Sequence, residues 1–307
     1  MYELIIVGGG PAGAAAAIYA ARKRLKTVLI TSEWGGQSTV STDIQNWIGT
    51  PSISGNDLAK NLRTHVEAYA GEWLTIVAPA WATGLKTFDD RVEVTVKNGT
   101  TYTAQGALIA TGANRRKLDI QGAAEYDQKG LTYCASCDGP LFADKDVVVV
   151  GGGNAGFESA LQLLTYCKSV TLLHKGESYR ADKISVDAAL AHPNMRGVLN
   201  AEPLEIIGET FVTGIRWKDV KTGKEETAAV EGVFVEIGLI PNTSWFGTAV
   251  ELNDMKQVKI DPRTQRTSHP RVWAAGDGTD VLYHQNNIAA GDAVRALEDI
   301  HTTLRHG

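Results

Sequence analysis

The pattern that most constrains the fold is an apolar strand, a glycine-rich turn, a helix and a second strand, in that order. It first occurs as the strand Leu4–Val7, the turn Gly8–Gly13, an alanine-rich helix to about Arg24 and the strand Thr27–Ile30. The glycines of the turn match G-x-G-x-x-G, in which they permit a sharp bend, the close approach of a pyrophosphate and the packing of helix on strand. The phosphates would lie at the helix N-terminus, where free N–H groups favour anions. Without a ligand, the same pattern is only a tight strand-to-helix turn.

The same pattern recurs in the middle of the chain. It comprises the strand Val147–Val150, the turn Gly151–Gly156, a helix from Phe157 to about Tyr166 and the strand Val170–Leu173. The copies are too far apart for a solenoid repeat, so they indicate two related domains. Chains with two such folds usually hold a flavin in one and a nicotinamide in the other, because the flavin accepts hydride from the nicotinamide. The sequence therefore predicts an α/β protein with two dinucleotide sites.

Composition and charge exclude several classes of protein. With 307 residues, 43% hydrophobic and 21% charged, the chain has the composition of a soluble globular protein of about two domains. Its formal net charge of -5 provides no positive field for a nucleic acid, so none is expected as a partner. The longest apolar run, Ala14–Ala21, is shorter than the roughly 20 residues that span a bilayer. No basic or cleavable apolar segment precedes Leu4, so we expect no membrane association and a cytoplasmic location.

Two of the three cysteines, Cys134 and Cys137, lie in the stretch YCASCDGP. A structural zinc needs about four ligands, and only Cys167 remains, so we expect no metal site. A structural disulfide here would close a very short loop in a compartment that keeps thiols reduced. A redox-cycling pair fits better, because the helix dipole at a helix start lowers a thiol pKa and favours the reactive thiolate. Cys167 falls in an apolar helical pattern and is expected in the core.

These features together resemble the low-molecular-weight thioredoxin reductase family of flavoproteins. Besides YCASCDG, the matching stretches across the chain are Ala110–Ala113, Gly238–Thr243, Ala275–Gly278 and Ala289–Gly291. The resemblance implies two Rossmann-like dinucleotide-binding domains of three-layer ββα architecture, the second inserted into the first. Residues 1–113 and 243–307 would form the FAD-binding domain. Residues 114–242 would form the NAD(P)H-binding domain, which carries the cysteines.

The resemblance also implies catalytic roles for Cys134, Cys137 and Asp138. Cys137 would face the flavin, and Cys134 would attack the disulfide of a protein substrate through a mixed disulfide. Asp138 would move a proton to and from the pair, which suits a carboxyl whose pKa is raised by partial burial. The alternative is that Asp138 only caps the turn that follows it.

The FAD contacts implied by the resemblance come from several loops. The turn would hold the pyrophosphate, the loop from Glu33 would meet ribose and flavin, and Asp277 would accept a ribityl hydroxyl. The full set is Gly8, Gly10, Pro11, Ala12, Gly13, Glu33, Gly35, Gly36, Gln37, Asn46, Val77, Thr111, Gly112, Gly276, Asp277 and Gln285. His284 and Asn286 replace the arginine and alanine that usually flank this glutamine, so the flavin edge is expected to differ. Trp81 and Trp245 are interpreted as core or interface packing.

The implied nicotinamide site departs most from the family pattern. Its residues would be Gly151, Gly153, Asn154, Gly156, His174, Lys175 and Arg180. Relatives that use NADPH carry His-Arg-Arg and a further arginine, whereas here Lys175 and Gly176 replace the first two arginines. Lysine lacks the bidentate fork of arginine, and Glu177 suits a free ribose, so NADPH and NADH both stay open.

The function implied by the resemblance is that of a homodimeric FAD-dependent disulfide oxidoreductase. Electrons would pass from NADPH or NADH through FAD and the Cys134/Cys137 pair to thioredoxin or a thioredoxin-like protein. One alternative is a relative that draws electrons from ferredoxin or a second flavin, although the intact second glycine turn argues against it. The sequence also leaves open electron delivery to a peroxiredoxin system and a role as a flavin-binding redox sensor.

Overall fold

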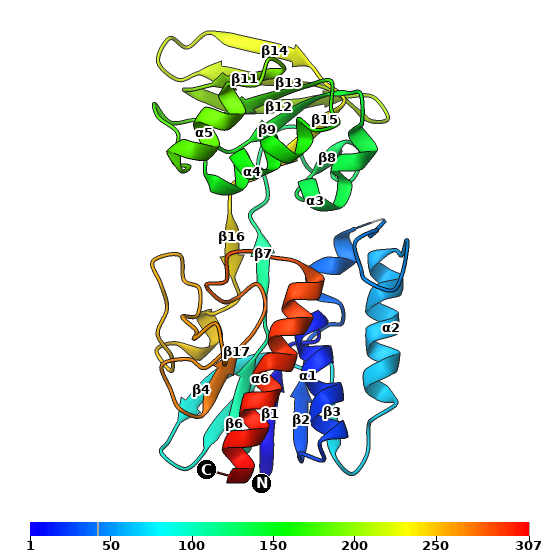
Figure 1. The fold of residues 1–307 in the computed structure, drawn as a ribbon, viewed down its shortest axis with the longest axis vertical. Helices are drawn as coiled ribbons and strands as arrows, with labels where there is room; N and C mark the ends of the chain where they lie inside the picture. The colour runs from blue at the N-terminus through cyan, green and yellow to red at the C-terminus, as the bar shows by residue number, and fades with distance from the viewer. Residues whose placement is uncertain (42, 307) are drawn as a thin grey trace. The chain divides into compact units, whose positions relative to one another are not determined.

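The computed structural model describes residues 1–41 and 43–306; residues 42 and 307, both in the predicted FAD-binding domain, lie outside this description. The chain divides into two compact units (Figure 1). Unit 1 comprises Met1–Asn114 and Ile240–Gly307, and unit 2 comprises Arg115–Leu239, inserted between them in sequence. The chain crosses between the units in β7 (Ala113–Arg115) and β16 (Leu239–Pro241), which pair with each other.

Unit 1 is built on a sheet with the strand order β3-β2-β1-β6-β5-β4, in which β17 also pairs with β6. Its strands are β1 (Tyr2–Val7), β2 (Thr27–Ile30), β3 (Leu74–Val77), β4 (Ala82–Thr87), β5 (Val92–Val96), β6 (Thr101–Ile109) and β17 (Val272–Ala274). The strands β1, β2, β3, β6 and β17 are parallel, whereas β4, β5 and the start of β6 form an antiparallel meander. Every position of β2 is buried, as expected of a parallel strand covered on both faces.

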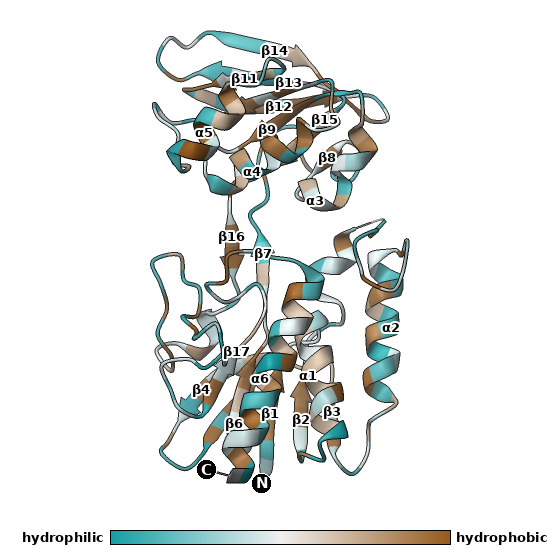
Figure 2. Ribbon diagram, viewed as in Figure 1, coloured by the Kyte–Doolittle hydropathy of each residue, from teal (hydrophilic) through white to brown (hydrophobic). Residues whose placement is uncertain are grey.

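Helices cover one face of this sheet, and the meander covers the other. The helices on the first face are α1 (Pro11–Arg22), α2 (Gly55–Glu67) and α6 (Asn286–His306), with the short 3-10 helix η1 (Gly36–Val40) next to α2. A second 3-10 helix, η3 (Ser244–Phe246), packs on the meander side instead. The alanines of α1 leave room for α6 to pack directly against it, and both helices share a core with β1 and β2. The strand residues that face the meander form a second core. Figure 2 shows that the strands of this sheet are largely hydrophobic. Unit 1 therefore has the three layers predicted.

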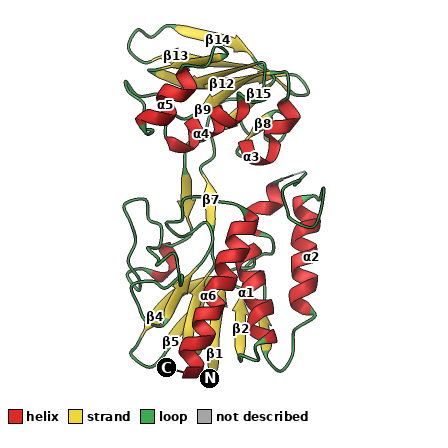
Figure 3. Cartoon of the chain, viewed as in Figure 1, coloured by secondary structure: helices red, strands yellow, loops and turns green. Residues whose placement is uncertain are grey.

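Unit 2 repeats this plan with a smaller parallel sheet (Figure 3). The order β11-β10-β9-β15-β8 joins β8 (Leu131–Thr132), β9 (Asp146–Val150), β10 (Ser169–Leu173), β11 (Met195–Val198) and β15 (Gly232–Val235). An antiparallel sheet of β12 (Ala201–Gly208), β13 (Val212–Asp219) and β14 (Glu225–Ala229) packs on one face. The other face carries α3 (Ala135–Asp138), η2 (Gly139–Phe142), α4 (Asn154–Leu163) and α5 (Lys183–Leu190). The predicted α/β fold with two dinucleotide-binding domains is confirmed.

Helix bounds differ slightly from those expected from the sequence. α1 ends at Arg22, because Arg24 has a φ of 55°, outside the helical region. α4 begins at Asn154 rather than Phe157, since the residue after the turn glycine already has helical geometry. Within the described residues, no helix is long and apolar enough to cross a bilayer.

Candidate active site

The first glycine turn has the geometry that the motif requires. Gly8 has a φ of 124°, and a Cβ placed there would lie 2.1 Å from the carbonyl oxygen of Ala110. A Cβ on Gly13 would lie 1.8 Å from the carbonyl oxygen of Gly8, so α1 packs on β1 only because this residue has no side chain. Gly10 is the N-cap of α1, with Pro11 at the first position of the helix. The turn therefore presents the open N-terminus of α1 to an anionic ligand.

A cavity of about 400 Å³ lies over this turn within unit 1. The predicted residues that line it are Gly8, Gly10, Pro11, Ala12, Glu33, Gly36, Gln37, Thr111, Gly112, Gly276 and Asp277. Its volume is within the range of small-molecule sites. Glu33 and Asp277 are its charged lining residues, so a diphosphate would be held by backbone N–H groups and the α1 dipole. Carboxylates at these positions suit ribose and ribityl hydroxyl groups. The lining therefore fits a flavin dinucleotide.

Five predicted FAD residues do not line the cavity. Gly13 packs under the turn, and Gly35 shapes the loop with a φ of 84° and an N–H that donates to Gly9 over 2.9 Å. Asn46 Nδ2 donates to Gln285 Oε1 over 3.0 Å. The remaining one, Val77, packs in the core between sheet and meander. Their contacts with FAD therefore stay predictions.

Two tryptophans interpreted as packing residues line the cavity instead, Trp81 and Trp245. Trp245 Nε1 donates to Thr111 Oγ1 over 3.4 Å, and Thr111 Oγ1 donates to the backbone oxygen of Asn242 over 2.8 Å. Asn242 Nδ2 in turn donates to the backbone oxygen of Thr111 over 2.9 Å. The sequence signal for Trp245 was its position two residues after the matching stretch that ends at Thr243. Trp81 had no such signal.

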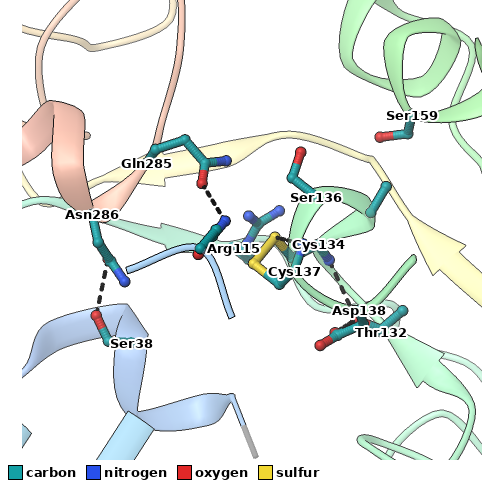
Figure 4. The surroundings of a disulfide bond; sticks show 12 residues. Ser38, Arg115, Thr132, Cys134, Ser136, Cys137, Asp138, Ser159, Gln285 and Asn286 are labelled. Carbon is teal, nitrogen blue, oxygen red and sulfur yellow. Dashed lines mark hydrogen bonds between the residues drawn. A yellow bond between two sulfur atoms is a disulfide. The ribbon is translucent and has the colours of Figure 1, made fainter. Parts of the chain in front are cut away.

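The residues that flank Gln285 change the polar contacts at one end of the cavity. Ser38 Oγ donates to Asn286 Oδ1 over 3.0 Å, a hydrogen bond that the usual alanine lacks (Figure 4). His284 Nδ1 lies 3.6 Å from Asp277 Oδ1. Asn286 therefore ties the start of α6 to η1, and the imidazole of His284 lies beside the carboxylate expected to bind the ribityl chain.

The second glycine turn, in unit 2, repeats the geometry of the first. Gly151 has a φ of 132°, and a Cβ on Gly156 would lie 1.9 Å from the carbonyl oxygen of Gly151. Gly153 is the N-cap of α4, and a Cβ there would meet no atom within 4 Å. The side chain of Asn154 bonds Asp182 twice, with Asn154 Oδ1 accepting from the Asp182 N–H over 2.8 Å and Asn154 Nδ2 donating to Asp182 Oδ2 over 3.3 Å. The start of α4 is thus open to a phosphate and is fixed to the loop that follows β10.

The loop after β10 offers little to a phosphate at the two positions where the resemblance implies arginines. A Cβ on Gly176 would lie 2.7 Å from Nε2 of His174, so a side chain there requires the imidazole to move. Lys175 Nζ lies 2.6 Å from Glu202 Oε1 on β12, which already neutralises its charge. Burial lowers the pKa of His174, and the nearby Arg180 guanidinium lowers it further. Of the predicted phosphate ligands, only Arg180 is an exposed arginine.

Cys134 and Cys137 form a disulfide, with their Cα atoms 5.3 Å apart (Figure 4). Cys134 is the N-cap of α3, which confirms the predicted helix start. The Cys137 N–H donates to Cys134 Sγ over 3.2 Å, a contact that would stabilise a thiolate on Cys134. Cys167 is buried, donates to the carbonyl oxygen of Phe142 over 3.2 Å, and has its pKa raised to about 11 by burial. It is a core residue, as predicted.

Asp138 is buried beside the disulfide and is held by a residue that sequence reasoning missed. The carboxylate accepts a hydrogen bond from Thr132 Oγ1, and Thr132 Oγ1 accepts one from the Cys134 N–H over 3.3 Å. The Asp138 side chain does not cap η2, which removes the support for a turn-capping role. Thr132 is only 3% exposed, on β8. A hydroxyl residue two positions before the first cysteine was the available signal.

The Thr132 bridge predicts a measurable effect on disulfide exchange. Asp138→Asn should slow the reaction of the reduced pair with a small aromatic disulfide about 100-fold, because a general acid–base group is lost. Thr132→Val should slow it about tenfold, the value of one hydrogen bond to a charged group. Thr132→Ser keeps the hydroxyl and serves as the control. Stopped-flow absorbance measures all three, and a wild-type rate for Thr132→Val would contradict the bridge.

Comparison with known proteins identifies the family. Residues 2–307 match the family described as "Pyridine nucleotide-disulphide oxidoreductase". The F subunit of alkyl hydroperoxide reductase from Staphylococcus aureus is 40% identical over 295 residues, which are 96% of this chain and 57% of that protein. The chain therefore spans little more than half the length of these curated relatives.

Solved structures agree with this match. "Thioredoxin reductase from Giardia duodenalis" has a TM-score of 0.93 at 31% identity, covering 99% of this chain and 98% of that one. The thioredoxin reductase from Streptococcus pyogenes has a TM-score of 0.89 at 33% identity, covering 100% and 99%. The predicted resemblance to low-molecular-weight thioredoxin reductases is confirmed, and the chain belongs to the pyridine nucleotide-disulphide oxidoreductase family.

Proposed function

We propose that this protein is a flavin-dependent disulfide reductase of the thioredoxin reductase type, with thioredoxin or a thioredoxin-like protein as its substrate. The observation that carries the proposal is the Cys134–Cys137 disulfide at the start of α3, beside the buried Asp138, in a chain with two dinucleotide turns. The resemblance further supports a cytoplasmic homodimer. Such a dimer is checked by light scattering of the purified protein.

The family implies a flavin and a nicotinamide nucleotide, and we propose FAD as the flavin. When bound, a flavin supplies two-electron transfer between a nicotinamide and a disulfide. The N-terminus of α1 would hold the diphosphate, and Glu33 would accept hydrogen bonds from the adenosine ribose. Asp277 would bind the ribityl chain, while Trp245 and Thr111 shape the wall beside Asn242. The contact of Glu33 with the adenosine ribose favours FAD over a flavin mononucleotide, which has no ribose.

The cysteine pair would carry out the exchange with the protein substrate. In the reduced pair, the Cys134 thiolate attacks one sulfur of the partner's disulfide, forming a mixed disulfide and releasing the other sulfur as a thiolate. Cys137 then attacks Sγ of Cys134, which re-forms the internal disulfide and releases the partner as a dithiol. Two electrons leave the pair. The proton that Cys134 gives up when it forms the thiolate and the proton of the Cys137 thiol pass to the two sulfurs of the partner. Asp138 would transfer these protons at the cysteine sulfurs.

We propose NADH as the preferred donor, because unit 2 offers little to a 2'-phosphate. Gly176 leaves no arginine, and Glu202 already pairs with Lys175. The wild type should favour NADH over NADPH at least about tenfold, since it lacks charge-assisted phosphate bonds. Glu202→Gln frees the lysine and should raise kcat/KM for NADPH about twofold to fivefold, the scale of an exposed ion pair, with NADH unaffected. Adding Lys175→Ala to the Glu202→Gln variant should remove this gain. An unchanged kcat/KM for NADPH in Glu202→Gln would contradict the proposal that the ion pair with Glu202 keeps Lys175 from the phosphate.

The test of the function is turnover with the purified protein. The bound flavin is identified after release from the protein, and NADH oxidation is then followed with oxidised thioredoxin as the acceptor. Sustained turnover supports the proposal. One round of flavin reduction without turnover would instead support a redox sensor, and no reduction by either nucleotide would support a different electron donor.

A second acceptor follows from one comparison. The 40% identity with the F subunit of alkyl hydroperoxide reductase favours delivery of electrons to the disulfide centre of a peroxiredoxin system. Parallel assays with thioredoxin and with such a centre, at equal concentrations, decide between the two. The acceptor with the higher kcat/KM is the physiological class.

A further inference from the structure

A buried carboxylate that the proposed chemistry does not use lies against the redox helix. Glu236 follows the end of β15, and its side chain is 11% exposed. Its carboxylate accepts a hydrogen bond from the backbone N–H of Ala135, the residue after Cys134. Ser159 Oγ on α4 donates to Glu236 Oε1 over 2.9 Å, and Arg115 Nη1 lies 3.9 Å from Oε2. The carboxylate therefore contacts the first residue of α3 from outside that helix.

The hydrogen bonds alone do not require a carboxylate at this position. A glutamine would accept from Ser159 and Ala135 through its amide oxygen, without the cost of burying a charge. The charge at Glu236 is only partly compensated, because the Arg115 contact is long. Burial raises the pKa of Glu236, and Glu158 on α4 adds to this, while Arg115, Ser159 and the Ala135 N–H oppose it. These opposing influences act on a carboxyl group that contacts the first residue of the helix that starts at Cys134.

Two backbone N–H groups of α3 have different acceptors, one the sulfur of Cys134 and the other the carboxylate of Glu236. The Cys137 N–H points to Cys134 Sγ, whereas the Ala135 N–H is taken by Glu236. A thiolate on Cys134 gains from the first N–H and is disfavoured by the nearby carboxylate charge. Reduction of a disulfide takes up two electrons and two protons if both sulfurs end as thiols, and one proton if one stays a thiolate. A charged Glu236 therefore favours the uptake of two protons by Cys134 and Cys137 on reduction, because it disfavours a thiolate on Cys134.

We propose that Glu236 is a positioning residue for disulfide exchange, whose carboxylate fixes the start of α3 and sets how readily Cys134 forms a thiolate. The proposal rests on the proposed function and deepens it, since Cys134 is the cysteine assigned to attack the partner. Glu236 acts through the helix backbone and through its charge. Asp138 keeps the task of proton transfer.

The test measures the thiol directly and needs neither flavin, nucleotide nor partner. The reduced protein is alkylated with iodoacetamide across a pH series, and modification of Cys134 is followed by peptide mass spectrometry. Glu236→Gln keeps both hydrogen bonds and removes the charge, so the alkylation midpoint of Cys134 should move down by about one pH unit. Glu158→Gln is the comparison variant, because it removes an exposed charge that acts on Glu236 more weakly than burial, Arg115, Ser159 or the Ala135 N–H does, and it should move the midpoint by much less.

Two outcomes would overturn the proposal: an unchanged midpoint in Glu236→Gln, or an equal shift in Glu158→Gln. If Glu236→Gln unfolds, Ser159→Ala gives a second measurement, because loss of this donor favours the neutral acid and should move the midpoint in the same direction by less. An unchanged alkylation midpoint of Cys134 in Ser159→Ala would also contradict the proposal. NADH-dependent thioredoxin turnover of the wild type is measured separately, so failure of the proposed function is distinguished from failure of this inference.

Discussion

Cys137→Ser is expected to lower turnover with a protein disulfide on the order of 10³-fold or more, while the flavin still binds and is still reduced by NADH. Cys137 closes the disulfide with Cys134, so without it the mixed disulfide on Cys134 has no internal thiol to resolve it. Steady-state NADH oxidation with thioredoxin measures the loss, and anaerobic flavin bleaching measures what remains. Retention of near-normal turnover would remove the redox role of the pair.

The matched control is the third cysteine. Cys167→Ser keeps a donor to the carbonyl oxygen of Phe142 and should leave turnover unchanged. The two active cysteines should also differ from each other. Cys137→Ser should accumulate a mixed disulfide with thioredoxin that is visible by mass spectrometry, whereas Cys134→Ser should not, because it lacks the attacking sulfur. The reverse pattern would exchange the two assigned roles.

Gly156→Ala is expected to abolish binding of the nicotinamide nucleotide and to destabilise unit 2 by about 1–3 kcal/mol, as overpacking of a tight contact does. The added Cβ would lie 1.9 Å from the carbonyl oxygen of Gly151, so α4 must move away from the turn. Flavin content should stay normal, because unit 1 has its own cores. Calorimetric titration with ADP-ribose and thermal unfolding measure the two effects.

Gly153→Ala separates binding from stability in this site. A Cβ there meets no atom within 4 Å, so the free energy of unfolding should change by less than about 0.5 kcal/mol. The same Cβ projects beside the helix N-terminus where phosphates would bind, so nucleotide affinity should still fall. Normal ADP-ribose affinity in Gly156→Ala would show that the turn does not form the nucleotide site.

Local patterns were enough to predict the parts of the fold that neighbouring residues determine. The strands β1 and β2 and both glycine turns follow from apolar runs and from contacts across a few residues, such as Gly13 on Gly8. The redox helix start at Cys134 is equally local. These features can be read from the sequence because the residues that determine each of them lie in one short stretch.

The parts that could not be predicted depend on residues far apart in the chain. Trp245 reaches the cavity only because the segment after β16 returns to Thr111. Lys175 is neutralised by a glutamate on β12, and the amide of Ala135 is met by Glu236 from the end of β15. No spacing rule links these positions. Val77, by contrast, was predicted from the resemblance alone; it packs, partly buried, against the core between sheet and meander, and its contact with FAD stays a prediction.

Unit 1 is built from both ends of the chain, and this affects how the protein folds during synthesis. Unit 2 is continuous in sequence, whereas unit 1 needs α6 and β17 to cover α1 and extend its sheet. Because domains fold as units while they emerge from the ribosome, unit 2 can complete its core before unit 1 does. The early residues of α1 must wait, partly uncovered, until translation reaches the segment that packs on them. Flavin loading is therefore a late event in the maturation of this protein.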